Sequence, residues 1–185
     1  MKDLIHNSIK KHSDALKYID EEIILSASSI IIDAIKNNKT IFWCGNGGSA
    51  SQANHLSAEL VGGMYQKKIK PFKSICLNVD TAFITAWSND DSFDNIFIRQ
   101  LEALGQSGDI LIGLSTSGNS PNIVQAAKFA CSNKIKVISL TGNDGGSLNK
   151  YSDININIPT NSTQRIQEMH ILIGHILCDI VELDL

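Results

Sequence analysis

The segment from Asp109 to Asn122 places the strongest constraint on how this chain can fold. It begins with the apolar run Ile110–Leu114, which is too short for a buried helix and is typical of a parallel strand covered on both faces. Hydroxyl residues follow around Gly118, and Pro121 then stands at a first-turn position before a helical pattern over 123–130. The segment therefore predicts a strand, a loop and the start of a helix.

The composition of this loop has two explanations. Its hydroxyl residues are Ser115, Thr116, Ser117 and Ser120. Free backbone N–H groups and the positive end of a helix dipole can bind an anion, and hydroxyls can fill the remaining acceptor positions of a phosphate. The loop contains no Lys or Arg, so dipoles and hydrogen bonds would have to balance the charge. A solvated turn that ends in an N-cap explains the same residues.

The composition suits one domain and argues against several classes of function. The 185 residues are 43% hydrophobic and 19% charged, which is ordinary for a soluble globular protein. A formal charge of −3 gives no reason to expect nucleic acid as a partner. We find neither a signal-peptide core nor the roughly 18 uninterrupted apolar residues of a membrane span, which predicts a cytoplasmic protein without a membrane partner. The four scattered cysteines predict reduced thiols.

The N-terminal region predicts a long helical seam. Its apolar positions recur at alternating spacings of four and three, at Ile5, Ile9, Leu16, Ile19, Ile23 and Ile30, with His12 and Ser26 on the two remaining rungs. Acidic residues over 20–22 could start a second helix. Because a seam of about four heptads exceeds what a small sheet requires, we interpret 1–38 as a helical oligomerisation region. A purely intrachain helix is the alternative, and we expect His12 to be a tolerated polar core residue.

The rest of the chain, 39–185, alternates between strands and helices. We predict strands at 40–44, 74–79, 110–114, 135–140 and 154–158, helices at 50–64, 82–87, 93–104, 123–130 and 163–183, and a turn at 88–91. Five strands alternating with helices imply right-handed crossovers. The predicted fold is therefore α/β, a flavodoxin-like five-stranded parallel sheet sandwiched by helices, with an N-terminal helical extension.

A glycine-rich turn, G-N-G-G-S at 45–49, follows the first predicted strand. In α/β proteins this is where backbone comes close to a ligand. The turn is not G-x-G-x-x-G, and Lys67–Lys70 stand where a dinucleotide site would have its acidic residue, so a dinucleotide enzyme is disfavoured. Since ligands of such folds bind beyond the carboxyl ends of the strands, we expect this turn and the serine loop to line one crevice.

Two predicted helices carry residues suited to chemistry. His55 and Glu59 stand four residues apart on one helix face, where they could bind a metal, place a base beside an acid, or decorate a solvated surface. On the terminal helix, polar residues interrupt a nearly apolar surface at Gln167, Glu168, His170 and His175, and buried ones need partners. His170 alone is best explained as a core histidine hydrogen-bonded to a neighbour.

The separation of Gln167 and His175 limits how they could share a site. They are eight residues apart, about 12 Å along an α-helix. One metal could take both only if the helix is interrupted or if the two residues come from different subunits.

Six short motifs occur in one order along the chain. They are C-G-N-G-G-S at 44–49, H-x-x-x-E at 55–59, S-N-D at 88–90, S-T-S-G-N-S at 115–120, T-G-x-D-G-G at 141–146 and R-I-Q-E-M-H at 165–170. Together they resemble the phosphoheptose isomerases, which are sugar-isomerase (SIS) domain proteins. The resemblance implies conversion of sedoheptulose 7-phosphate to D-glycero-D-manno-heptose 7-phosphate through a cis-enediolate, in bacterial heptose and lipopolysaccharide biosynthesis. It also implies a homotetramer with sites at subunit interfaces.

The resemblance further implies roles for individual residues. Ser115, Thr116, Ser117 and Ser120 would hold the phosphate, and Asn46, Gly47, Gly48, Asn89, Asp90, Glu59 and Gln167 would contact the sugar. A zinc ion, one per subunit, would be bound by His55, Glu59, Gln167 and His175. Glu59 would also be the catalytic base and His175 the acid, because moving a carbonyl from C2 to C1 requires proton transfers and stabilised oxygens. A zinc-bound carboxylate is a poorer base, so Glu59 would have to loosen its metal bond, or the zinc would be partly structural.

Two departures from the family pattern leave alternatives open. Gly63 stands where many members have Arg, and Gln164 stands where many have Asp. An isomerase acting on another phosphosugar, such as a hexulose phosphate, therefore remains an alternative. A non-catalytic SIS-domain scaffold that binds a replication initiator is another. Such scaffolds lack the active-site glutamate and histidine, so the presence of Glu59 and His175 favours the enzyme.

Overall fold

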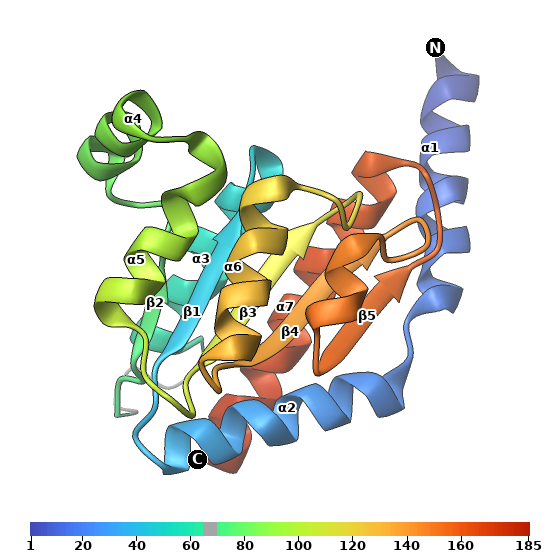
Figure 1. Cartoon of the computed structure of the whole chain (residues 1–185). Coiled ribbons are helices and arrows are strands. Elements are labelled where there is room, and N and C mark those ends of the chain that lie inside the picture. Colours follow the sequence, from blue (N-terminus) through green and yellow to red (C-terminus); the bar gives the residue numbers. More distant parts are fainter. Residues whose placement is uncertain (65–69) are drawn as a thin grey trace.

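A parallel five-stranded sheet with helices on both faces forms the centre of the molecule (Figure 1). The structure is a computed structural model and describes residues 1–64 and 70–185, so that only Lys70 of the Lys67–Lys70 stretch is described. The strands are β1 (Ile41–Gly45), β2 (Ser74–Cys76), β3 (Ile110–Ser115), β4 (Lys136–Gly142) and β5 (Ile154–Ile158), in the order β2-β1-β3-β4-β5. All neighbours pair in parallel. This order confirms the predicted flavodoxin-like fold.

The helices divide between the two faces of the sheet. They are α1 (Lys2–Ala15), α2 (Glu21–Lys36), α3 (Gly48–Gly62), α4 (Thr81–Asp90), α5 (Ile96–Leu104), α6 (Pro121–Ser132) and α7 (Thr163–Asp184), with 3-10 turns η1 (Leu16–Tyr18), η2 (Phe93–Asn95) and η3 (Ser147–Tyr151). One buried cluster joins α2, α3 and α7 to the sheet, and the other joins α5, α6 and η3 to the opposite face. Both layers are needed because the central strands are apolar on both sides.

Strand β1 shows why the central strands are continuous apolar runs. Ile41 and Trp43 belong to the cluster under α2, α3 and α7, whereas Phe42 and Cys44 belong to the cluster under α5 and α6. Successive side chains of a strand point to opposite faces, so a strand covered on both sides has no position for a solvated residue. The same alternation buries every residue of β3.

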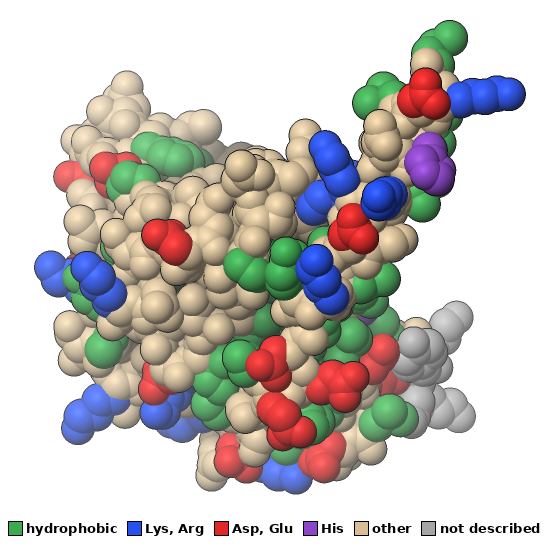
Figure 2. Space-filling view, turned by 90° about the vertical axis from the view of Figure 1, so that its right-hand side faces the viewer, with side chains coloured by type: hydrophobic (Ala, Val, Ile, Leu, Met, Phe, Trp, Pro, Cys, Tyr) green, Lys and Arg blue, Asp and Glu red, His purple; other side chains and the backbone are tan. Residues whose placement is uncertain are grey.

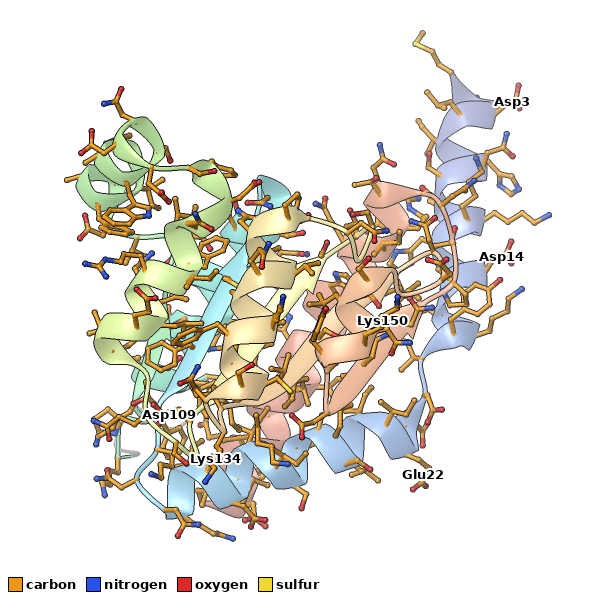
Figure 3. All side chains as sticks on the ribbon, viewed as in Figure 1. Asp3, Asp14, Glu22, Asp109, Lys134 and Lys150 are labelled. Atoms are coloured by element: carbon orange, nitrogen blue, oxygen red, sulfur yellow. The ribbon has the colours of Figure 1, made fainter. Side chains whose placement is uncertain are left out.

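The amino ends of the strands are tied together by Asp109, which lies at the end of the sheet opposite the predicted crevice (Figure 3). Its carboxylate accepts hydrogen bonds from the backbone N–H groups of Thr40, at 2.9 Å, and Gln106, at 2.8 Å. The two turns that lead into β1 and β3 are thereby held in register, which leaves the carboxyl ends of these strands free to carry the site.

Two predicted boundaries were wrong, each for a local reason. The turn expected at 88–91 is helical through Asp90, because the Ser88 hydroxyl donates to the Ile84 carbonyl within α4. The strand expected at 74–79 ends at Cys76. Beyond it, the side chain of Asn78 bonds to both the N–H and the C=O of Gly45, where the next backbone pair would be.

The N-terminal seam is divided between two helices. The carboxylate of Asp20 accepts from the N–H groups of Glu22 and Ile23 and begins α2, as the acidic residues predicted. The apolar residues of α2 pack against the sheet of their own chain, as the intrachain alternative expected. Helix α1 instead projects from the body, with Ile5 and Ile9 more than 60% exposed. Figure 2 shows apolar and charged side chains interspersed along this projecting helix.

His12 is not a core residue, which corrects the sequence-based expectation. Its Nδ1 lies 2.7 Å from Oε2 of Glu168 on α7, and both side chains are partly exposed. The histidine therefore links α1 to α7 at the surface.

None of the helices in the described part of the chain has the length and apolar character of a membrane span.

Candidate functional site

The serine corner, residues 115–120, joins β3 to α6 as predicted. The hydroxyls of Ser115 and Ser120 lie 3.1 Å apart across its mouth, and the Ser117 hydroxyl accepts from the N–H of Asn119 at 3.1 Å. Ser120 occupies the N-cap position, but its side chain makes no capping hydrogen bond. The Ser120 hydroxyl therefore faces Ser115 instead of capping α6, whereas the N–H of Ile123 bonds to the Asn122 side chain.

The glycine turn lies directly beside the serine corner. Asn46 follows β1, and Asn122 is the second residue of α6. Their side-chain amides form a reciprocal pair, in which each Nδ2 donates to the other Oδ1 at 2.9 Å. This pair confirms that the two loops share one edge of the sheet. Sequence reasoning missed Asn122, although an amide directly after the first-turn proline of a ligand-side helix was the available signal.

The serine corner is also supported by the loop after β4. A Cβ atom on Gly118, whose φ is +64°, would collide with the carbonyl oxygen of Gly145. The side-chain Oδ1 of Asn119 accepts from the N–H of Ser147 at 2.9 Å. The glycines of the T-G-N-D-G-G motif therefore allow two backbones to lie in contact, which holds the serine corner in shape.

The proposed acid and base lie on neighbouring helices. The Nε2 atoms of His55 on α3 and His175 on α7 are 2.9 Å apart, and Oε1 of Glu59 lies 3.5 Å from Nε2 of His55. The two imidazole rings meet edge to face, with centroids 5.1 Å apart. His55 is 47% exposed and Glu59 is 24% exposed, so the cluster opens to the surface of the single chain. Three of the four predicted metal ligands are therefore brought together.

Gln167, the fourth predicted ligand, lies elsewhere on α7. Its side chain faces Gly48, where a Cβ would come within 2.6 Å of Nε2, and its backbone carbonyl accepts from the Gln52 amide at 2.6 Å. His55 is seven residues beyond Gly48, about 10 Å further along α3. Because α7 is unbroken from Thr163 to Asp184, the alternative of an interrupted helix is wrong.

The residue types in this cluster suit zinc, but their positions in this structure are not those of zinc ligands. Two imidazole nitrogens and a carboxylate oxygen are ligands that zinc accepts. Histidine nitrogens bound tetrahedrally to one zinc lie about 3.3 Å apart, so the hydrogen-bonded imidazoles would have to separate slightly. Within residues 1–64 and 70–185, no group of three or more His, Cys, Asp or Glu side chains is arranged to hold a metal ion.

Asn89 and Asp90 end α4, which stands out from the sheet (Figure 1). Both residues are exposed, and the Asn89 amide donates to the Asp90 carboxylate at 2.9 Å. No residue of α4 is buried. The helix therefore presents these two polar side chains at its end rather than packing them into the chain.

Other reactive groups near the cluster are inert. Burial, and secondly the charge of Glu59, raise the pKa of Cys178 to about 12, so this thiol stays protonated. All four cysteines are free, as predicted. His170 is fully buried, with Nε2 3.0 Å from the Thr141 carbonyl oxygen, which confirms it as a core histidine.

The two departures from the family pattern lie at helix ends. Gly63 follows α3 with a φ of +77°, a conformation that an arginine would adopt only with strain, and its N–H bonds to the Glu59 carbonyl. Gln164 is exposed in the first turn of α7 and accepts from the Ser162 hydroxyl at 3.3 Å. Both positions thus have a local structural role.

Comparisons with known proteins identify the family. A sequence model of the SIS domain matches residues 6–142. A phosphoheptose isomerase of a Nitratiruptor species is 45% identical over 181 residues, which are 96% of each chain. Another, of Helicobacter hepaticus, is 46% identical over 184 residues, covering 98% of this chain and 93% of the relative.

Solved structures give the same result. Phosphoheptose isomerase GmhA of Neisseria gonorrhoeae has a TM-score of 0.88 and 38% identity, covering 98% of this chain and 96% of the other. A phosphoheptose isomerase of Francisella tularensis has a TM-score of 0.90 and 34% identity, covering 98% and 95%. The sequence resemblance is thereby confirmed over nearly the whole length. The chain belongs to the phosphoheptose isomerase family of SIS-domain proteins.

Proposed function

We propose that this protein is a phosphoheptose isomerase, which interconverts sedoheptulose 7-phosphate and D-glycero-D-manno-heptose 7-phosphate in bacterial heptose biosynthesis. The observation that carries the proposal is the meeting of His55, Glu59 and His175 on two helices that both begin at the ligand edge of the sheet. Relatives about 45% identical over nearly the full length are named phosphoheptose isomerases, which supports it.

The serine corner is proposed to anchor the phosphate. The hydroxyls of Ser115, Thr116, Ser117 and Ser120 would donate to its oxygens, and α6 would add the positive end of its helix dipole. Asn46, Gly47 and Gly48 would contact the sugar, with Asn89 and Asp90 reaching it from α4 and Gln167 from α7. A ligand so anchored keeps its carbonyl end at a fixed distance from the phosphate.

The chemical step is a proton transfer between adjacent carbons. The Glu59 carboxylate would take a proton from C1 of the ketose and return it to C2, while His175 gives a proton to O2 and receives the one from O1. The reaction is balanced, because the enzyme ends in the protonation state in which it began. The 2.9 Å contact between the Nε2 atoms of His55 and His175 requires one nitrogen to carry a proton and the other to accept it.

Zinc is proposed as the cofactor, one ion per subunit. His55, Glu59 and His175 would hold it, with Gln167 supplied by another subunit, since the unbroken α7 separates the two ligands of one chain. When bound, zinc would supply positive charge near the oxygens that become negative during the reaction.

The proposed assembly is a homotetramer with sites at its interfaces. The cluster on α3 and α7 faces outward, and the exposed apolar residues of α1 lack a covering surface within the described chain. The proposed location is the cytoplasm, since four free thiols suit a reducing compartment.

An isomerase assay tests the proposal directly. Purified protein is offered a panel of ketose phosphates, including sedoheptulose 7-phosphate and a hexulose phosphate, with and without a chelator. We expect turnover of the seven-carbon ketose and its loss with the chelator. Turnover of only another sugar would reassign the substrate, and no turnover of any sugar by metal-replete protein would overturn the enzyme proposal.

A further inference from the structure

Hydrogen bonds fix the orientation of both side-chain amides in the reciprocal pair of Asn46 and Asn122. Asn122 is 1% exposed, and its Oδ1 accepts both from Asn46 and from the backbone N–H of Ile123, at 3.0 Å. Since an N–H can bond only to the oxygen, the Ile123 contact fixes which end of the amide is Nδ2. That nitrogen then points to Oδ1 of Asn46, which it meets at 2.9 Å.

Only amides satisfy both halves of this arrangement. Each side chain must donate and accept at once toward its partner, which a carboxylate cannot do and an apolar group cannot do at all. This partly buried polar pair is not needed to fill space, because apolar side chains of the same shape can stabilise a core equally well. The pair therefore calls for an explanation beyond packing.

The sheet does not need this link to hold together. Strand β1 is already paired with β3 along the whole of its length, from Ile41 with Ile110 to Gly45 with Leu114. The amide pair lies beyond the last of these paired residues, between the loop after β1 and the first turn of α6. What it adds is a fixed separation between the glycine turn and the first turn of α6.

We infer that Asn122 is a positioning residue that orients the Asn46 side chain and sets the glycine turn against the phosphate-binding serine corner. This inference rests on the proposed function, which gives the phosphate to one loop and the sugar to the other. The pair makes the two loops one rigid template, so that an anchored phosphate leaves the sugar in one place relative to Asn46. Asn122 itself acts through Asn46 rather than by touching the reacting atoms.

A double-mutant cycle in the full-length protein separates positioning from stability. The variants are Asn122→Leu, Asn46→Leu and the double variant. Leucine is close to asparagine in shape and adds no charge near the phosphate. We expect Asn122→Leu to lower kcat about tenfold to a hundredfold, which is the usual cost of a misplaced substrate. The inhibition constant of inorganic phosphate, which reports the serine corner alone, should change by less than about twofold.

The double variant provides the decisive comparison. Leaving one amide unpaired destabilises the fold, whereas replacing both restores an apolar contact, so its Tm should recover toward that of the wild type. Its kcat should nevertheless stay as low as that of Asn46→Leu. Recovery of kcat together with Tm would show that the pair is only structural, and losses that multiply would show that Asn122 acts independently of Asn46. Either result overturns the inference, as does an unchanged kcat in Asn122→Leu.

Gln100 offers a matched control. This partly buried amide on α5 donates to the Leu77 and Ile96 carbonyls, at 2.9 and 3.1 Å, and has no proposed contact with substrate. Gln100→Leu should lower Tm without changing kcat.

A crystal structure of Asn122→Leu keeps the two proposals distinguishable. If the wild type isomerises no phosphosugar, the proposed function fails, but the positioning inference still requires Asn46 to leave its present orientation in the variant. An Asn46 side chain that stays in place would reject the inference whatever the activity.

Discussion

The Nε2 atoms of His55 and His175 lie 2.9 Å apart, in residues 120 positions apart in the chain. This contact exists because α3 and α7 follow strands of the same parallel sheet and lie side by side on the same face. Glu59, one turn beyond His55 on α3, completes the group at 3.5 Å.

Removing either histidine should remove the metal. His55→Ala and His175→Ala are each expected to leave less than about a tenth of the zinc bound by the wild type after dialysis, because a zinc site depends on all its protein ligands. Metal content by atomic emission measures this independently of activity. His6→Ala, an exposed histidine on α1, is the control and should retain zinc. Wild-type protein without zinc after metal-replete expression would contradict the proposed cofactor.

Replacing the base should stop the chemistry without disturbing the assembly. Glu59→Gln keeps the size of the side chain but cannot take a proton, so kcat should fall by about 10²- to 10⁴-fold. Exchange of the C1 proton with solvent should be lost in parallel, which NMR in deuterated water measures. Glu102→Gln, on the exposed surface of α5, is the control. Substantial residual turnover by Glu59→Gln would remove this residue from the mechanism.

Removing one hydroxyl from the serine corner should weaken substrate binding more than it slows the chemical step. Ser117→Ala removes one hydroxyl donor to the phosphate, so KM should rise roughly tenfold while kcat changes by less than about twofold. Initial rates over a range of substrate concentrations separate the two constants. Ser132→Ala, whose hydroxyl bonds only within the last turn of α6, should leave both unchanged. An unaltered KM in Ser117→Ala would count against the phosphate site.

His170 should make the fold sensitive to acid. Burial lowers the pKa of this imidazole from 6.5 to about 4, so the neutral form is the one that the fold accepts. Above pH 6.5 His170 is neutral in both states and costs the fold nothing. As the pH falls from 6.5 toward 4, the free energy of unfolding decreases, because the unfolded chain then binds the proton more readily. The loss at pH 5 is about 2 kcal/mol.

Urea unfolding at pH 7 and pH 5 measures this effect. His170→Gln can still donate to the Thr141 carbonyl but does not titrate, so its free energy of unfolding should fall by about 2 kcal/mol less than that of the wild type over this interval. Equal losses in the two proteins would show that other groups account for the acid sensitivity.

The projecting helix α1 should be required for assembly. Ile5 and Ile9 are 61% and 62% exposed, and replacing both by Asp would place charge on the apolar seam. The double variant should sediment as species smaller than the wild type at the same concentration, with an unchanged circular dichroism spectrum. Ser13→Asp, an exposed polar position of the same helix, is the control. An unchanged sedimentation coefficient would exclude these residues from the interface.

Much of the fold could be predicted because its signals are local. The apolar run of β3, the hydroxyl loop and Pro121 indicated a strand, a loop and a helix start, and the structure has all three. Asp20 likewise marked the start of α2. The errors arose where a side chain competed with the backbone: Ser88 bonded within its helix, and Asn78 replaced a rung of the sheet.

Parts of the site could be predicted and parts could not. His55 and Glu59 share a helix face by spacing alone, so their proximity could be read from the chain. His175, Gln167 and Asn122 come from other elements, and no local pattern says which residues they contact. Asn122 in particular was missed because its partner, Asn46, lies on the neighbouring strand's loop.

The sequence by itself determined the alternation of strands and helices, the two ligand loops and the residue types suited to acid–base chemistry, because these follow from periodicity and short-range bonding. Only the tertiary structure decided that His55 meets His175, that Gln167 lies beside Gly48, and that Asn122 pairs with Asn46. Each of these contacts depends on how the crossover helices pack against a twisted sheet. That arrangement is set by packing among many distant side chains, and no short segment contains it.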